Sequence, residues 1–111
     1  MNWESIEGTG WIEVPGFGRI NPRRDNEVAG GRQYFTAMTE NDEHARATGP
    51  SIGGGPETWH FEFDQPFWLA DRSGHCIEVE ISLLVGGLYS VKYRPGTWPL
   101  GDSDSASGGW S

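Results

Sequence analysis

One stretch of the chain, residues 58–94, alternates apolar and polar side chains with the two-residue period of a β-strand. The alternation runs over residues 59–63, again over 77–85 and a third time over 89–93, with polar or glycine-rich segments between them. Successive side chains of a strand point to opposite faces of a sheet. The pattern therefore predicts an antiparallel meander with one apolar face.

Two short turns decide how these strands pair. A three-residue loop over 72–74 places the apolar side chains of the two strands that it joins on the same face, with Gly74 in the left-handed position. A three-residue loop over 86–88 does the same for the next pair and puts Val85 opposite Tyr89. A slip of one residue would invert every side chain, so we expect these two loop lengths.

The apolar face of such a meander has to be covered by other strands. Residues 10–20 predict a hairpin that turns at Pro15-Gly16, and residues 33–38 predict a short strand. The expected fold class is therefore all-β: a small antiparallel β-sandwich or partly open barrel with a C-terminal pair of meander hairpins.

The rest of the chain carries few strand signals. We expect at most one short surface helix, over residues 40–48 with Thr39 as its N-cap, and loops over 21–32 and 49–57. The expected organisation is a tail, one β domain and a second tail that contains Gly, Ser and Trp: residues 1–9, 10–94 and 95–111.

The charge balance excludes several classes of function. The chain has 8 Lys and Arg against 16 Asp and Glu, a formal net charge of −8, which disfavours nucleic acids and anionic membrane surfaces as partners. No apolar run approaches the roughly 18 residues that a membrane helix needs. Without a signal sequence we expect an intracellular protein, or one incorporated into an assembly. The single cysteine excludes an internal disulfide and a cysteine-based zinc cage.

Basic residues are concentrated in one segment. Residues 19–32 carry a charge of about +2, and the rest of the chain about −10. A cationic loop on an anionic body suits docking on an acidic protein or head-to-tail contact between copies, although a solvated loop explains it as well. A phosphate contact through Arg23 and Arg24 lacks a supporting motif or aromatic platform.

Tryptophans outside the apolar face predict a partner surface. Trp68 has the parity of the polar face, next to Glu78, and four other tryptophans lie outside the meander. The predicted partner-binding residues are Arg23, Arg24, Trp3, Trp68, Trp98 and Trp110. The predicted acidic face consists of Glu62, Asp64, Glu78 and Glu80.

Two constellations resemble catalytic or metal sites. His60, Glu62 and Asp64 share one strand face and could hold a metal, but the solvated face of a half-buried strand has the same pattern. His75 and Cys76 are consecutive strand residues, so their side chains should point apart rather than form a nucleophile and base. We predict no metal, no cofactor and no enzyme activity.

The sequence thus favours a non-enzymatic protein-interaction or assembly component, such as a small structural subunit of a virion. One alternative is an acidic inhibitor or immunity-type protein that caps a basic site on an enzyme. Another is a carbohydrate-binding module that uses Trp68 and Trp98.

Overall fold

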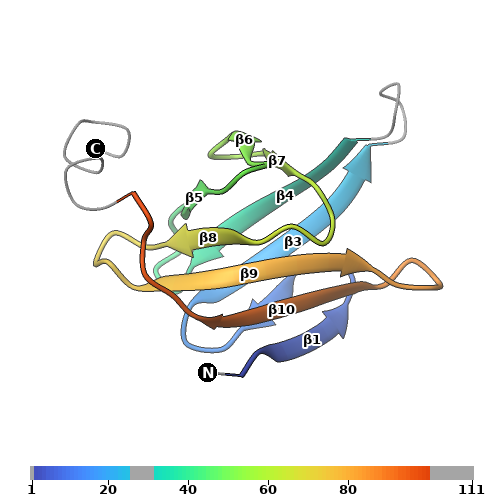
Figure 1. Ribbon diagram of the computed structural model, residues 1–111, viewed down its shortest axis with the longest axis horizontal. Helices are drawn as coiled ribbons and strands as arrows, with labels where there is room; N and C mark the ends of the chain where they lie inside the picture. Colours follow the sequence, from blue (N-terminus) through green and yellow to red (C-terminus); the bar gives the residue numbers. More distant parts are fainter. Residues whose placement is uncertain (1, 26–31, 101–111) are drawn as a thin grey trace.

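A computed structural model describes residues 2–25 and 32–100, which form two five-stranded antiparallel sheets packed face to face (Figure 1). Sheet 1 has the order β1 (Glu4–Gly8), β10 (Tyr89–Pro95), β9 (Cys76–Leu83), β8 (Phe67–Ala70), β5 (Arg46–Thr48). Sheet 2 has the order β2 (Ile12–Val14), β3 (Gly18–Asp25), β4 (Arg32–Thr39), β7 (Trp59–Phe61), β6 (Gly53–Gly54). The all-β prediction is confirmed, and the arrangement is a sandwich rather than a closed barrel.

Aromatic side chains from both sheets form the centre of the core. Phe35 of β4 stacks on Phe67 of β8 with 4.9 Å between ring centroids, and Phe61 of β7 meets Phe35 edge-on at 5.5 Å. Phe35 and Phe67 are completely buried. These rings join the two sheets, because Phe35 and Phe61 come from sheet 2 and Phe67 comes from sheet 1.

Turn chemistry explains the hairpins that the sequence predicts correctly. The amide of Phe17 donates to the carbonyl of Val14 at 3.0 Å across Pro15-Gly16, and Gly16 has a φ of 80°. In the β8–β9 hairpin Leu69 lies opposite Ile77, as the loop over 72–74 requires. The predicted strand over 33–38 lies within β4.

The expected single meander is wrong in one respect, because the chain changes sheets between β7 and β8. β7 pairs with β4 in sheet 2, whereas β8, β9 and β10 belong to sheet 1. Phe61 and Phe67 both point into the core from opposite sides. Residues of the same parity can therefore face each other across a sandwich as well as share one sheet face.

The register of the β9–β10 hairpin also differs from the prediction. Tyr89 lies opposite Leu83, and Leu84 donates its amide to the carbonyl of Leu88 at 2.8 Å. The expected pairing of Val85 with Tyr89 is therefore wrong by two residues, a shift that keeps every side chain on its predicted face. Val85 instead lies at the tip, followed by Gly86 with a φ of 88°.

Both ends of the described chain are more ordered than predicted. The expected tail over residues 1–9 contains β1, in which Ile6 lies opposite Val91 of β10. The predicted C-terminal tail begins inside β10, which extends to Pro95. Residues 101–111 lie outside the described part of the chain, so the prediction for them stays open.

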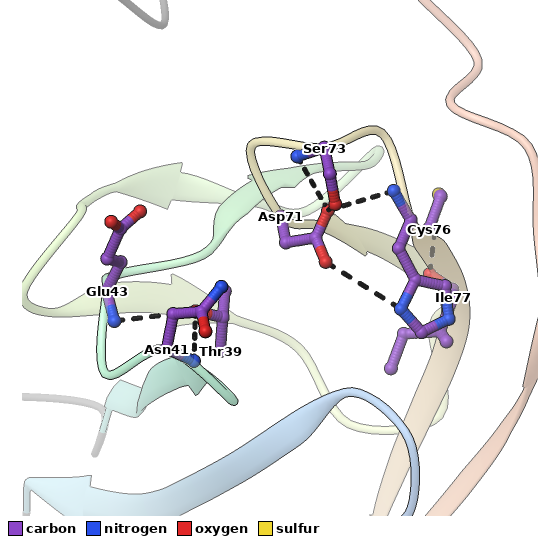
Figure 2. Close-up of polar contacts among 8 residues, drawn as sticks. Thr39, Asn41, Glu43, Asp71, Ser73, Cys76 and Ile77 are labelled. Atoms are coloured by element: carbon purple, nitrogen blue, oxygen red, sulfur yellow. Dashed lines mark hydrogen bonds and ion pairs between the residues drawn. The ribbon is translucent and has the colours of Figure 1, made fainter.

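The helix expected over residues 40–48 is absent. A turn follows β4, and residues 46–48 form β5 instead. The Thr39 hydroxyl does accept hydrogen bonds from the amides of Asn41 and Glu43, at 3.3 and 3.4 Å, but it caps a turn (Figure 2). The segment has no apolar stripe that would pack a helix against the core. Its last residues instead pair as β5 at the edge of sheet 1.

The two predicted loops are shorter than expected. β3 extends to Asp25 and β4 begins at Arg32, so both strands enter the predicted 21–32 loop. The predicted 49–57 loop contains β6, which pairs with β7. These polar and glycine-rich residues form strands because their backbones pair with a neighbouring strand, although their side chains bury little surface.

Candidate functional site

The outer face of sheet 1 brings together two of the predicted tryptophans. The guanidinium of Arg94 lies 4.2 Å from the ring centroid of Trp3, and its Nε donates to Oε1 of Glu78 at 2.9 Å. Glu78 in turn lies opposite Trp68 in the β8–β9 ladder. The result is a transverse row, Trp3–Arg94–Glu78–Trp68, of alternating aromatic and charged side chains.

A third tryptophan lies at the edge of this face. Trp98 stacks on the guanidinium of Arg46, with 4.4 Å to the ring centroid. The chain reaches this position through Gly96, whose amide donates to the carbonyl of Cys76 at 3.0 Å. A Cβ on Gly96 would approach Cδ1 of Trp68 to 3.3 Å, so the backbone passes close against that ring. Trp110 lies outside the described residues.

The predicted acidic face is interleaved with basic side chains. Glu80 lies opposite Lys92 in the β9–β10 ladder, and Glu78 forms its ion pair with Arg94. Asp64 lies beside the same strand, where it accepts a hydrogen bond from the Ser82 hydroxyl. These carboxylates therefore share one side of β9, but the neighbouring cations neutralise part of their charge.

The three residues of the possible metal constellation are directed to different surroundings. The His60 ring covers Gly53 on the outer side of sheet 2, where a Cβ would come within 2.2 Å of Cε1. Asp64 instead accepts a hydrogen bond from Ser82 of sheet 1, and Glu62 is exposed on the segment that links β7 to β8. In the described part of the chain, no group of three or more His, Cys, Asp or Glu side chains is arranged to hold a metal ion.

In the loop between β8 and β9, Asp71 and Ser73 lie close together (Figure 2). Nδ1 of His75 lies 3.7 Å from Oδ2 of the same aspartate. Oδ1 of Asp71 accepts hydrogen bonds from the Ser73 amide, the Ser73 hydroxyl and the His75 amide at 2.9–3.0 Å. The hydroxyl proton thus goes to the carboxylate and not to the imidazole, so this is a loop-stabilising arrangement and not an activated nucleophile.

The neighbouring thiol is also poorly suited to nucleophilic chemistry. Cys76 is buried, and desolvation raises its pKa to about 11, a shift that Arg46 opposes and Glu78 and Asp71 reinforce. A thiol with this pKa stays protonated near neutral pH, whereas a reactive cysteine needs the thiolate.

The most unusual surface is the tip of the β9–β10 hairpin, which projects beyond the neighbouring strands (Figure 1). Val85 is 100% exposed, Leu83 42% and Leu88 39%. We call these three residues the apolar tip. Sequence reasoning missed it because Val85 fits the strand alternation; the run Leu83-Leu84-Val85 before two glycines was the available signal.

The predicted arginines lie on the opposite sheet from the tryptophan row. Arg23 and Arg24 are exposed near the end of β3 in sheet 2. Arg19, earlier on the same strand, is already engaged: it pairs with Asp42 at 2.8 Å and lies over the Trp11 ring at 5.1 Å. The predicted partner-binding residues therefore form two separate surfaces and not one.

We compared the chain with protein-family models, curated proteins and solved structures. No family model, curated protein or solved structure matches this chain. Among the described residues, no helix has the length and apolar character required to cross a membrane.

Proposed function

We propose that this protein is a non-enzymatic interaction component that docks on a protein partner through its apolar tip. The observation that carries the proposal is the full exposure of Val85 between the half-exposed side chains of Leu83 and Leu88. Contiguous apolar surface on a soluble protein marks interaction sites, whereas isolated apolar residues do not. Burying one such side chain contributes about 1.5–3 kcal/mol, so a pocket that accepts the tip would gain substantial affinity.

The conformation of the tip supports a docking role. The amide of Leu84 donates to the carbonyl of Leu88 at 2.8 Å, and the amide of Gly87 donates back to the carbonyl of Leu84 at 3.3 Å. Gly86 and Gly87 have φ values of 88° and 82°, which glycine adopts without a steric penalty. A turn held in this way loses little conformational entropy on binding.

Charge favours a protein pocket over a lipid surface as the partner. The net charge of −8 repels the anionic headgroups that attract peripheral membrane proteins.

The two hairpins at the ends of β9 also differ in character. The loop with Arg72 and Ser73 is polar and exposed, whereas the loop with Val85 is apolar. The polar loop at one end of β9 is therefore a suitable control position for the apolar loop at its other end.

The two alternative functions have less support. An acidic inhibitor needs carboxylates free to meet a basic site, and Glu78 is already bonded to Arg94. A carbohydrate module needs open aromatic faces, and the Arg46 guanidinium is stacked on the ring of Trp98, one of the two tryptophans that this alternative uses.

A position-specific crosslink tests the docking proposal. A photoreactive amino acid replaces Val85 in the full chain, and the same group replaces Arg72 in a matched control. Both proteins are irradiated in an extract of the cells that produce the protein. Excess unlabelled wild type, or a competitor carrying Leu83→Asp and Leu88→Asp, is then added.

The proposal expects a protein adduct of defined mass from position 85 and none from position 72. Wild type should compete at least tenfold better than the Asp variant, and an adduct mass of twice the chain would identify the partner as a second copy. Equal adducts from both positions, adducts with lipid alone, or no adduct at position 85 would overturn it.

A further inference from the structure

A pocket on the outer face of sheet 2 has no place in the proposed docking function. Its described lining consists of Arg23, Arg24, Tyr34 and Thr58, and its volume is about 440 Å³. Tyr34 lies opposite Arg23 in the β3–β4 ladder, and Thr58 immediately precedes β7. The fold thus brings together residues from three separate segments, and it supplies the aromatic side chain that the sequence alone did not place beside the arginines.

The Arg23 guanidinium is held in a fixed orientation. Its Nη1 donates to Oγ1 of Thr36 at 3.0 Å and to the carbonyl of Asn21 at 3.5 Å, and its Nη2 donates to Oγ1 of Thr58 at 3.4 Å. The Thr36 hydroxyl donates its own proton to the carbonyl of Glu57 at 2.8 Å. This chain of hydrogen bonds sets the guanidinium plane before any ligand arrives.

The two arginines of the pocket differ from Arg19, an earlier residue of the same strand, in their partners. No ion pair joins Arg23 or Arg24 to a carboxylate in the described part of the chain, in contrast to Arg19 with its Asp42 partner. Thr58 accepts from Arg23, so its hydroxyl proton remains available to a ligand. Arg23 and Arg24 line this open space together with two hydroxyl-bearing residues, Tyr34 and Thr58.

We infer that this pocket binds a phosphate monoester. Guanidinium groups bind phosphate and carboxylate oxygens through paired, charge-assisted hydrogen bonds. A monoester carries close to two negative charges near neutral pH and three terminal oxygens, which match two guanidiniums and the Thr58 hydroxyl better than the single charge and two oxygens of a carboxylate.

The size of the pocket indicates that the ligand includes an organic group. A volume of about 440 Å³ falls in the range of small-molecule sites and exceeds what one phosphate fills. Tyr34 lines the same space and provides aromatic surface for a ring on the ester. Phenyl phosphate is therefore a suitable probe, with benzoate as its carboxylate counterpart and inorganic phosphate as the anion without a ring.

The experiment is an NMR titration of the full chain with these three compounds at constant ionic strength and pH 7.5. The variants are Arg24→Gln, Arg23→Met and Thr58→Val. The control is Arg19→Gln, which removes an arginine from the same strand outside the pocket. Melting temperatures establish that each variant is folded, and Arg24→Gln keeps the test valid because Arg24 is exposed near the end of β3.

Phenyl phosphate should shift the amide signals of Arg23, Arg24, Tyr34 and Thr58. Its affinity should exceed that of inorganic phosphate at least threefold and that of benzoate at least tenfold. Arg24→Gln and Thr58→Val should weaken it at least fivefold, and Arg19→Gln less than twofold. Equal affinity for phenyl phosphate and benzoate, or equal affinity in wild type and Arg24→Gln, would overturn the inference.

Discussion

The Nε atom of Arg94 lies 2.9 Å from Oε1 of Glu78, across the ladder that joins the last strand of the fold to its neighbour. The Glu78 side chain is only 16% exposed, and the Arg94 side chain 33%. The ion pair is thus partly shielded from solvent on the outer face of sheet 1. The Trp3 ring lies over the guanidinium and completes this shield.

Removing the charge of Glu78 should destabilise the fold. Glu78→Gln leaves the half-buried Arg94 cation without its counter-charge, and the expected loss is about 1.5 kcal/mol of unfolding free energy. Urea unfolding followed by tryptophan fluorescence measures it. The control is Lys92→Met, which removes an exposed charge opposite Glu80 and should cost less than about 0.5 kcal/mol. Equal losses in both variants would contradict this explanation.

Replacement by alanine should reduce the stability of the fold by very different amounts at two glycines with positive φ, Gly10 and Gly18. A Cβ on Gly18 would lie 2.0 Å from the carbonyl oxygen of Met38, because β3 passes directly against β4 there. Gly10 has a φ of 73° but no atom within 4 Å of such a Cβ. Gly10→Ala should therefore cost about 1 kcal/mol, from backbone strain alone.

The same substitution at Gly18 adds a clash with main-chain atoms, so we expect a loss of at least about 3 kcal/mol. Circular dichroism and urea unfolding distinguish the two variants, since an unfolded Gly18→Ala also agrees with the expectation. Similar stabilities for Gly18→Ala and Gly10→Ala would refute the close approach of β3 to Met38.

The buried thiol of Cys76 should make stability depend on alkaline pH. Burial raises its pKa from 9.0 to about 11 in the folded state, so the folded protein holds this proton more tightly than the unfolded chain. This contribution to stability is fully present below pH 9, declines as the pH rises and is lost above about pH 11.

The measurement is the difference in unfolding free energy between wild type and Cys76→Ala at several pH values from 8 to 11. Wild type should lose its advantage over the variant across this interval, while other groups titrate equally in both proteins. Iodoacetamide should also label wild type slowly at pH 8 and rapidly in denaturant. A constant difference across the interval would show that the thiol is not desolvated.

Local chemistry made part of this fold predictable from the sequence. Pro15-Gly16 and the loop over 72–74 each fix a hairpin through residues that are adjacent in the chain. The alternation in β9 identified its core side, since Val79 and Ile81 are completely buried. Such local signals can be interpreted without knowing which distant strands pair in the folded protein.

The errors arise where two arrangements satisfy the same pattern. Phe61 and Phe67 have equal parity, so the alternation fits one sheet or two facing sheets equally well. Leu83 and Val85 are both apolar, so a two-residue shift of the β9–β10 register leaves every face unchanged. β1 contains one aliphatic residue, Ile6, and its order depends on pairing with β10.

The candidate sites were predictable to different degrees. Charge alone singled out Arg23 and Arg24 as a possible contact. Tyr34 and Thr58 could not be added, because the position of Tyr34 depends on the β3–β4 register within a predicted loop, and that of Thr58 on the pairing of β4 with the more distant strand β7. Trp3 and Trp68 were selected as exposed aromatics, but their link through Arg94 and Glu78 requires the ladder registers of sheet 1.

The pairing of β1 with β10 has a consequence for biosynthesis. Residues 4–8 are translated well before residues 89–93, with which they pair. β1 therefore has no partner strand until residues 89–93 have left the exit tunnel, and sheet 1 is completed only then. Contacts between such distant segments slow folding, and the acidic side chains of β1, Glu4 and Glu7, oppose edge-to-edge association of the unpaired strand in the meantime.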